Sequence, residues 1–181
     1  MIVRAATEAD AEALAAIYGD AVLHGFGTFE EEPPSAADMD GRRRGVQDRG
    51  LPYLVAEADG RVLGFAYAGP FRPRAAYRYT LEDSVYVSPE AKGKGVGRAV
   101  LSAVIAACEA LGIRQLMAVI GDTQNAGSIG LHRALGFEQT GVGRSVGFKH
   151  GRWVDIVHMQ KALNGGDAAP PNGGGVTLTG H

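Results

Sequence analysis

Residues 81–111 read LEDSVYV, SPEA, KGKGVGR and AVLSAVIAACEAL, and the remaining chain can be placed around this stretch. The pattern over Thr80–Val87 predicts a β-strand, the glycines predict a tight turn, and the residues up to Leu111 predict a long helix. A glycine loop that opens a helix offers free backbone N–H groups and the positive end of the helix dipole. The stretch therefore predicts a binding site for an anionic group such as a pyrophosphate.

The predicted helix carries one apolar stripe. Its members recur at i, i+3 and i+4 and are Val100, Ala103, Val104, Ala107, Cys108 and Leu111. We interpret Cys108 as a small buried residue rather than a nucleophile, because no activating partner is visible in the sequence. A single cysteine also excludes an internal disulfide and a Cys-x-x-Cys metal site.

The other segments predict further strands and helices. Strands are expected at Ile2–Ala5, Tyr53–Ala58, Arg61–Ala68, Gln115–Ile120, Glu138–Val146 and Trp153–Leu163. Helices are expected from Thr7 to Gly25, from Ser35, and over Asn125–Leu135. Asp59-Gly60 predicts a tight hairpin, and Gly69-Pro70 predicts a break in the third strand.

The bulk composition indicates one ordinary globular domain. The chain has 181 residues, of which 45% are hydrophobic, and a formal net charge of −2. This charge gives no electrostatic case for nucleic acid or an anionic membrane as a partner, and we expect no metal. The first ten residues do not resemble a signal peptide, so we expect a cytoplasmic location. We expect a folded domain over 1–163 and a disordered Gly/Pro-rich tail over 164–181.

The glycine loop does not fit two common nucleotide sites. A P-loop requires Gly-x-x-x-x-Gly-Lys followed by Ser or Thr, and no such pair follows these glycines. A dinucleotide site requires Gly-x-Gly-x-x-Gly, whereas Gly93, Gly95 and Gly97 occupy every second position. A turn without any ligand is also a poor explanation, because three alternate glycines at a helix start serve no packing need.

The loop resembles the acetyl-CoA-binding motif of the GCN5-related N-acetyltransferase (GNAT) superfamily. That motif is [Gln/Arg]-x-x-Gly-x-[Gly/Ala], and Lys92, Gly95 and Gly97 occupy its three defining positions. The resemblance implies an α/β (α+β) fold with a mixed central sheet of about seven strands and about four flanking helices. It also implies acetyl-CoA as co-substrate. Its pyrophosphate would bind the backbone amides of Gly93, Lys94, Gly95, Val96, Gly97 and Arg98, and Lys92 would supply a long polar donor to the cofactor. Its pantetheine arm would pair with Val85, Tyr86 and Val87.

A second motif is similar to one from the same superfamily. Residues 125–137 read NAGSIGLHRALGF and resemble N-x-x-[SA]-x-x-L-Y-x-x-x-G-F. The resemblance implies that Asn125, with Ser128 nearby, contacts the pantetheine. The family's tyrosine donates a proton to the leaving thiolate, and here that position holds His132. A histidine can perform this step near neutral pH, because its ordinary pKa is about 6.5.

Longer segments resemble the phosphinothricin and methionine sulfoximine/methionine sulfone N-acetyltransferases. These segments are FRPRAAYRYTLEDSVYV, AVIGDTQNAGSIGLH and VGFKHGRWVD, and the resemblance runs from about Ile2 to Leu163. It implies acetylation of the α-amine of a small amino acid analogue by direct transfer, a detoxification role and a homodimer. It also suggests that the Lys149–Trp153 turn reaches the pocket or a partner subunit.

The chemistry of such a substrate suggests candidate residues. Arg72 and Arg74, on either side of Pro73, can bind a carboxylate or a phosphinate. Glu82 is the candidate general base, and backbone N–H groups near Val85 can stabilise the oxyanion. The remaining candidates for the substrate pocket are Phe26, Tyr77, Asp83 and Ser84. Asp83 alternates to the other face of the strand from Glu82, which makes it the weaker candidate base.

Two other functions stay open. One is N-acetylation of another amine or of a protein N-terminus, which the Arg72/Arg74 pair disfavours because such a substrate favours an acidic groove. The other is a non-catalytic acyl-CoA-binding module, which the presence of both Glu82 and His132 disfavours.

Overall fold

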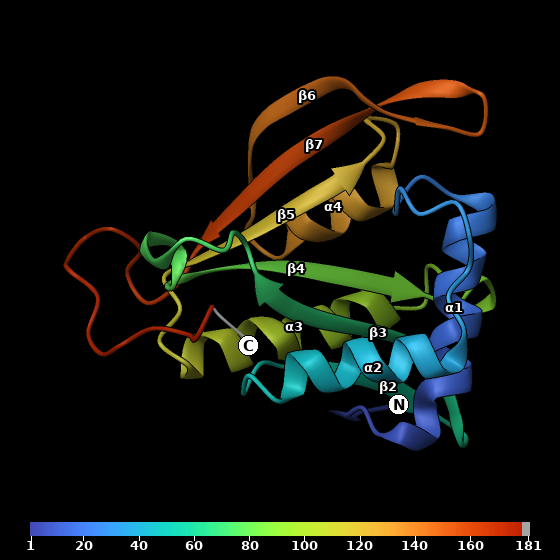
Figure 1. Cartoon of the computed structure of the whole chain (residues 1–181), viewed down its shortest axis with the longest axis horizontal. Coiled ribbons are helices and arrows are strands. Elements are labelled where there is room, and N and C mark those ends of the chain that lie inside the picture. The colour runs from blue at the N-terminus through green and yellow to red at the C-terminus, as the bar shows by residue number, and fades with distance from the viewer. Residues whose placement is uncertain (179–181) are drawn as a thin grey trace.

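A seven-stranded mixed sheet forms the centre of the computed structural model, which describes residues 1–178 (Figure 1). The strand order is β1 (Ile2–Ala5), β2 (Tyr53–Ala58), β3 (Arg61–Pro70), β4 (Thr80–Val87), β5 (Gln115–Gly121), β7 (Arg152–Ala162) and β6 (Glu138–Lys149). Neighbouring strands run antiparallel, except that β4 and β5 are parallel. The predicted fold class is confirmed.

Helices cover both faces of the sheet. α1 (Ala11–His24) and α2 (Ala36–Gln47) pack on one face, while α3 (Val96–Ala110) and α4 (Ala126–Ala134) pack on the other (Figure 1). The strands feed both layers because successive side chains point to opposite faces. On β2, Val55 packs toward α1 and α2, whereas Ala56 belongs to the cluster that packs against α3.

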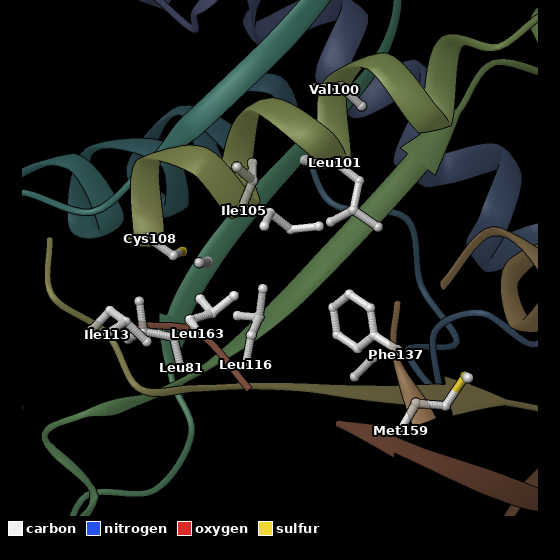
Figure 2. Packing of buried hydrophobic residues seen from close by; sticks show 14 of the residues in the cluster. Leu81, Val100, Leu101, Ile105, Cys108, Ile113, Leu116, Phe137, Met159 and Leu163 are labelled. Atoms are coloured by element: carbon white, nitrogen blue, oxygen red, sulfur yellow. The ribbon is translucent and has the colours of Figure 1, made fainter. Parts of the chain in front are cut away.

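The larger core lies between α3 and the sheet. Figure 2 shows Leu101 and Ile105 of α3 above Leu81 of β4 and Leu116 of β5. Cys108 is buried in the same layer, and burial raises the pKa of its thiol to about 12, which confirms that this cysteine is not an activated nucleophile. The expected buried stripe is present at Val100, Val104 and Cys108, but the prediction is wrong for Leu111, which ends the helix and is exposed.

Gly64 on β3 lets the start of α3 lie close to the sheet. A Cβ at this position would come within 2.8 Å of the Tyr86 carbonyl oxygen and 2.9 Å of the Val96 side chain. Any larger residue would push the N-terminus of α3 away from β4. The close approach matters because the glycine loop enters α3 at this point.

The pairing of β4 with β5 is short. It runs from Thr80 opposite Gln115 to Asp83 opposite Ala118 and does not continue beyond that pair. Residues Ser84–Val87 remain paired with β3 on their other side. The sheet therefore divides into two arms after Asp83, one carrying β1–β4 and the other carrying β5–β7.

The third strand continues past its expected end. The prediction of a break at Gly69-Pro70 is wrong, because Gly69 pairs with Glu82 and Pro70 pairs with Leu81. Proline lacks a backbone N–H and is tolerated where a strand has no second neighbour. β2 begins at Tyr53, opposite Tyr67, so β3 has only β4 beside it at Pro70.

Residues 164–178 contain turns but no helix or strand. They nevertheless contact the body, since Arg114 donates hydrogen bonds to the carbonyls of Gly166 and Ala169, and Val176 donates its N–H to Arg78. These contacts differ from those expected of a wholly disordered segment. The domain boundary at residue 163 stays a prediction, and residues 179–181 of the expected tail lie outside the described part of the chain.

Leu101→Ala should lower the free energy of unfolding by about 2–5 kcal/mol, because it removes a fully buried side chain and leaves a cavity below α3. Leu111→Ala is the matched control, since Leu111 is 44% exposed. Urea denaturation of both variants checks this. Equal losses would mean that the layer between α3 and the sheet is not tightly packed.

Candidate functional site

A groove of about 730 Å³ opens where β4 and β5 separate. Most of the expected site residues line it: Phe26, Asp83, Ser84, Val85, Tyr86, Val87, Lys92, Gly93, Gly95, Val96, Gly97, Arg98, Asn125, Ser128 and His132. The structure thus brings together the strand, the glycine loop and the start of α4. The volume of the groove is that of a typical small-molecule site.

The glycine loop forms one end of the groove. Gly93 and Gly95 have φ angles of 75° and 80°, a region that favours glycine, and Gly95 is the N-cap of α3. The first N–H groups of a helix have no intrahelical acceptor, so those at the start of α3 are free to bind an anion. A Cβ on Gly97 would come within 3.2 Å of Leu131 and 3.3 Å of Val87, so glycine leaves the groove open between these walls. Lys94 belongs to the loop but does not line the groove.

Asn125 begins α4 at the opposite wall. Its side-chain oxygen accepts a hydrogen bond from the Ser128 N–H at 3.1 Å, and its amide nitrogen donates to the Gly121 carbonyl at 3.4 Å. Asparagine is a preferred N-cap residue for this reason. The side chain thus joins the end of β5 to α4, and its expected contact with pantetheine stays a prediction.

His132 is buried and paired with Asp83. Its Nε2 lies 2.9 Å from Asp83 Oδ1, and its Nδ1 lies 2.8 Å from the Ser128 carbonyl oxygen. A carbonyl oxygen only accepts, so Nδ1 carries a hydrogen. One further proton therefore lies between Nε2 and Oδ1, either on the imidazole or on the carboxyl group.

This pair carries no net charge while it holds that proton. Burial raises the pKa of Asp83, and the hydrogen bond from His132 opposes that effect only in part. Burial lowers the pKa of His132, but the hydrogen bond and charge of Asp83 outweigh it and raise the value above the ordinary one. The second oxygen of Asp83 is buried and has no hydrogen-bond partner among the described residues.

The expected role of His132 as a freely available proton donor does not fit this geometry. Both ring nitrogens are occupied, and the side chain is 2% exposed. Donation to a thiolate would require the proton shared with Asp83. Asp83 likewise differs from an open substrate contact, because it is buried and hydrogen-bonded to His132. Alternation along the strand predicts that Asp83 points away from Glu82, but no sequence signal indicates its contact with His132, which lies 49 residues further along the chain.

Glu82 points to the other side of β4. Leu81 and Val85 pack with α3, so Glu82, Ser84 and Tyr86 face the layer of α1 and α2. Burial raises the pKa of Glu82, and the nearby charge of Arg72 opposes the rise in part. A half-buried carboxyl with a raised pKa is suited to accept a proton near neutral pH. Glu82 and the Asp83–His132 pair therefore lie on opposite sides of β4.

The candidate substrate arginines lie outside the groove. Arg72, Pro73 and Arg74 are exposed, and Tyr77 is 40% exposed, on the loop that precedes β4. The Arg72 guanidinium lies 4.3 Å from the centre of the Phe71 ring. This loop meets the N-terminal end of β4, near Glu82, whereas the glycine loop follows its C-terminal end.

The part of the chain that the structure describes contains neither a candidate metal site nor a candidate membrane span. Over residues 1–178, no group of three or more His, Cys, Asp or Glu side chains is placed to hold a metal ion. In the same residues, no helix has the length and apolar character needed to span a membrane.

The pair of Asp83 and His132 should make stability depend on pH. Since the folded state raises the pKa of His132 above about 6.5, the stabilisation is full below that pH and is lost as pH rises through the folded value. In Asp83→Asn, the asparagine amide N–H can donate a hydrogen bond to the neutral Nε2 of His132. The variant therefore keeps a hydrogen bond but loses the pH dependence of stability that the carboxylate causes. Urea unfolding from about pH 6 to pH 9 should show a steeper loss in the wild type than in this variant. Exposed Asp48→Asn is the control, and equal slopes for the wild type and Asp83→Asn would refute the shared proton.

Comparison with known proteins agrees with this geometry. The chain is 54% identical over 169 residues to a phosphinothricin N-acetyltransferase of Alcaligenes faecalis, covering 93% of this chain and 86% of that protein. It is 42% identical to an L-methionine sulfoximine/L-methionine sulfone acetyltransferase of Pseudomonas paraeruginosa, covering 93% of this chain and 98% of that protein.

A solved structure is also similar. It is the phosphinothricin acetyltransferase of Sinorhizobium meliloti in complex with acetyl-CoA, with a TM-score of 0.92, 49% identity and coverage of 96% of this chain and 94% of that chain. Residues 14–137 match the model of the Acetyltransferase (GNAT) family. The groove between β4 and β5, the glycine loop and these relatives together show that the chain belongs to the GNAT family of acetyltransferases.

Proposed function

We propose that this enzyme transfers an acetyl group from acetyl-CoA to the α-amine of a small amino acid analogue. The candidate acceptors are methionine sulfoximine, methionine sulfone and phosphinothricin, because the names of its relatives contain these compounds. The observation that carries the proposal is the groove itself. The glycine loop offers an anion site at the C-terminal end of β4, and Glu82, whose carboxyl pKa is raised, lies near the N-terminal end of the same strand.

Acetyl-CoA would bind along the C-terminal half of β4 and at the start of α3. The start of α3 and the glycine loop would bind the pyrophosphate of acetyl-CoA through backbone N–H groups. Beyond Asp83 the strand has no partner on its β5 side, so its backbone can pair with the extended pantetheine arm. Backbone N–H groups near Val85 would stabilise the oxyanion.

The acceptor would be bound and activated from the α1/α2 side. Glu82 would take a proton from the ammonium group, directly or through water, so that the amine can attack the thioester without a covalent enzyme intermediate. The new C–N bond would form as the C–S bond breaks, and CoA would leave as a thiolate that takes up the proton shared by His132 and Asp83 or a proton from water. Arg72 and Arg74 lie on the loop that enters β4 and would hold the acceptor's carboxylate or its sulfone or phosphinate oxygens. Phe26 would form part of the pocket wall.

We further propose that the enzyme is a cytoplasmic homodimer that detoxifies such analogues. Support for the dimer comes from the β6–β7 hairpin, where Val146, Phe148 and Trp153 are 53%, 57% and 63% exposed. Exposed apolar side chains grouped in this way are typical of a protein–protein interface.

Glu82→Gln should lower kcat by about 10²–10⁴-fold while the affinity for acetyl-CoA is kept, because the amide cannot accept the proton. Since burial raises the pKa of Glu82, the acid limb of kcat/KM in the wild type should lie above the ordinary carboxyl value of about 4.3. The variant should lack that limb. Glu109→Gln, at an exposed position of α3, is the control. Near-normal turnover of Glu82→Gln at both neutral and high pH would exclude this general base.

The acceptor class can be tested with one panel of free-thiol release assays. Methionine sulfone, methionine sulfoximine and phosphinothricin should release CoA thiol faster than glutamate, free methionine or a peptide with a free N-terminus. Turnover of the peptide alone would favour a protein acetyltransferase. Tight acetyl-CoA binding without turnover of any acceptor would favour the non-catalytic module.

A further inference from the structure

The β6–β7 hairpin contains a buried lysine that the proposed chemistry does not use. Lys149 is 2% exposed, and its Nζ donates hydrogen bonds to the carbonyl oxygens of Gly25 at 2.9 Å and Thr28 at 2.8 Å. Both acceptors belong to residues 25–28, the segment that leaves α1. Gly25, Phe26 and Gly27 of this segment line the groove.

The 25–28 segment crosses between the two arms of the sheet. It begins at the end of α1, which packs over β1–β4, and it reaches the C-terminal end of β5 (Figure 1). There the Phe26 carbonyl oxygen lies so close to Gly121 that a Cβ on Gly121 would collide with it. A Cβ on Gly147 of β6 would likewise collide with the ring of Phe29, which follows this segment.

The hairpin also holds the Phe26 ring. The Arg152 guanidinium lies 4.0 Å from the centre of that ring, and the His150 ring meets it edge-on with the centroids 5.4 Å apart. Lys149, His150 and Arg152 therefore contact the segment from one tight turn. The backbone is held by Lys149, and the aromatic side chain by its two neighbours.

Burying an ammonium group lowers the free energy of unfolding unless new hydrogen bonds replace those that the group made with water. Burial lowers the pKa of Lys149, and the charges of Glu31 and Glu30 oppose this effect. An apolar side chain of similar length would fill the space without that cost, so packing alone does not explain a lysine here. Two hydrogen bonds from one atom instead fix a backbone segment in which two of the four residues are glycines with wide conformational freedom.

We propose that Lys149 is a positioning residue that fixes the 25–28 segment, and with it Phe26, as the acceptor-side wall of the groove. The segment continues from α1, which covers the face toward which Glu82 points, whereas α3 and α4 supply the other wall. Loss of the two hydrogen bonds should therefore weaken acceptor binding more than acetyl-CoA binding. This inference rests on the proposed function.

The first test compares Lys149→Met, Lys149→Arg and the control Lys161→Met on β7. With methionine sulfone as acceptor, Lys149→Met should raise the acceptor KM at least about tenfold and change the KM for acetyl-CoA less than about threefold. Lys149→Arg, which keeps donors, should recover part of the loss, and Lys161→Met should match the wild type. An unchanged acceptor KM, or equal rises in both KM values, would overturn the proposal.

The second test does not depend on turnover. Hydrogen exchange of the substrate-free protein should show faster exchange within residues 26–30 in Lys149→Met but not in Lys161→Met. Unchanged exchange there would overturn the proposal, even if every acceptor fails as a substrate and the proposed function is wrong. Should Lys149→Met not fold, Gly147→Ala gives the decision, because its Cβ would displace the Phe29 ring. It should raise the acceptor KM in the same direction, and an unchanged KM would again overturn the inference.

Discussion

The early end of parallel pairing between β4 and β5 is the constraint on which the site depends. Four pairs, from Thr80/Gln115 to Asp83/Ala118, hold the arms together, and the strands then separate. A sheet that stayed paired would leave no unpartnered strand edge and no groove. The arms remain joined at one end by these pairs and by the core below α3, so the opening is built into the fold itself.

Two buried polar contacts brace this opening at its inner and outer ends. At the inner end, the last paired residue of β4 is Asp83, whose bond to His132 ties the strand to α4. At the outer end, Lys149 ties the segment after α1 to the hairpin of the other arm. Each contact joins residues that are far apart in the chain, so each stabilises the arrangement of the arms rather than one element.

The approximate strand and helix positions and an anion site at the glycine loop follow from periodicity and local turn chemistry, whereas the fold class was predicted from the resemblance of two motifs to the GNAT superfamily. The sequence was insufficient where a residue's role is set by a partner far along the chain. His132 could be placed on a helix, but its enclosure by Asp83 depends on how α4 packs on β4. Pro70 is a strong local signal for a strand end, yet β3 continues because its neighbour on that side begins later. The resemblance suggested that the Lys149–Trp153 turn reaches the pocket or a partner subunit, but no sequence signal indicated that Lys149 binds the backbone of residues 25–28.

Glu82 and Asp83 point to opposite faces of β4, and this placement separates the residues near the proposed base from those that form the anion site. Residues around Glu82 belong to the layer of α1, α2 and the loop before β4, while the anion site belongs to α3. In the proposed arrangement, substitutions in the first layer would change which amine is accepted while the binding of acetyl-CoA is kept. One strand can thus support enzymes that keep a single donor and diverge widely in the molecules they modify.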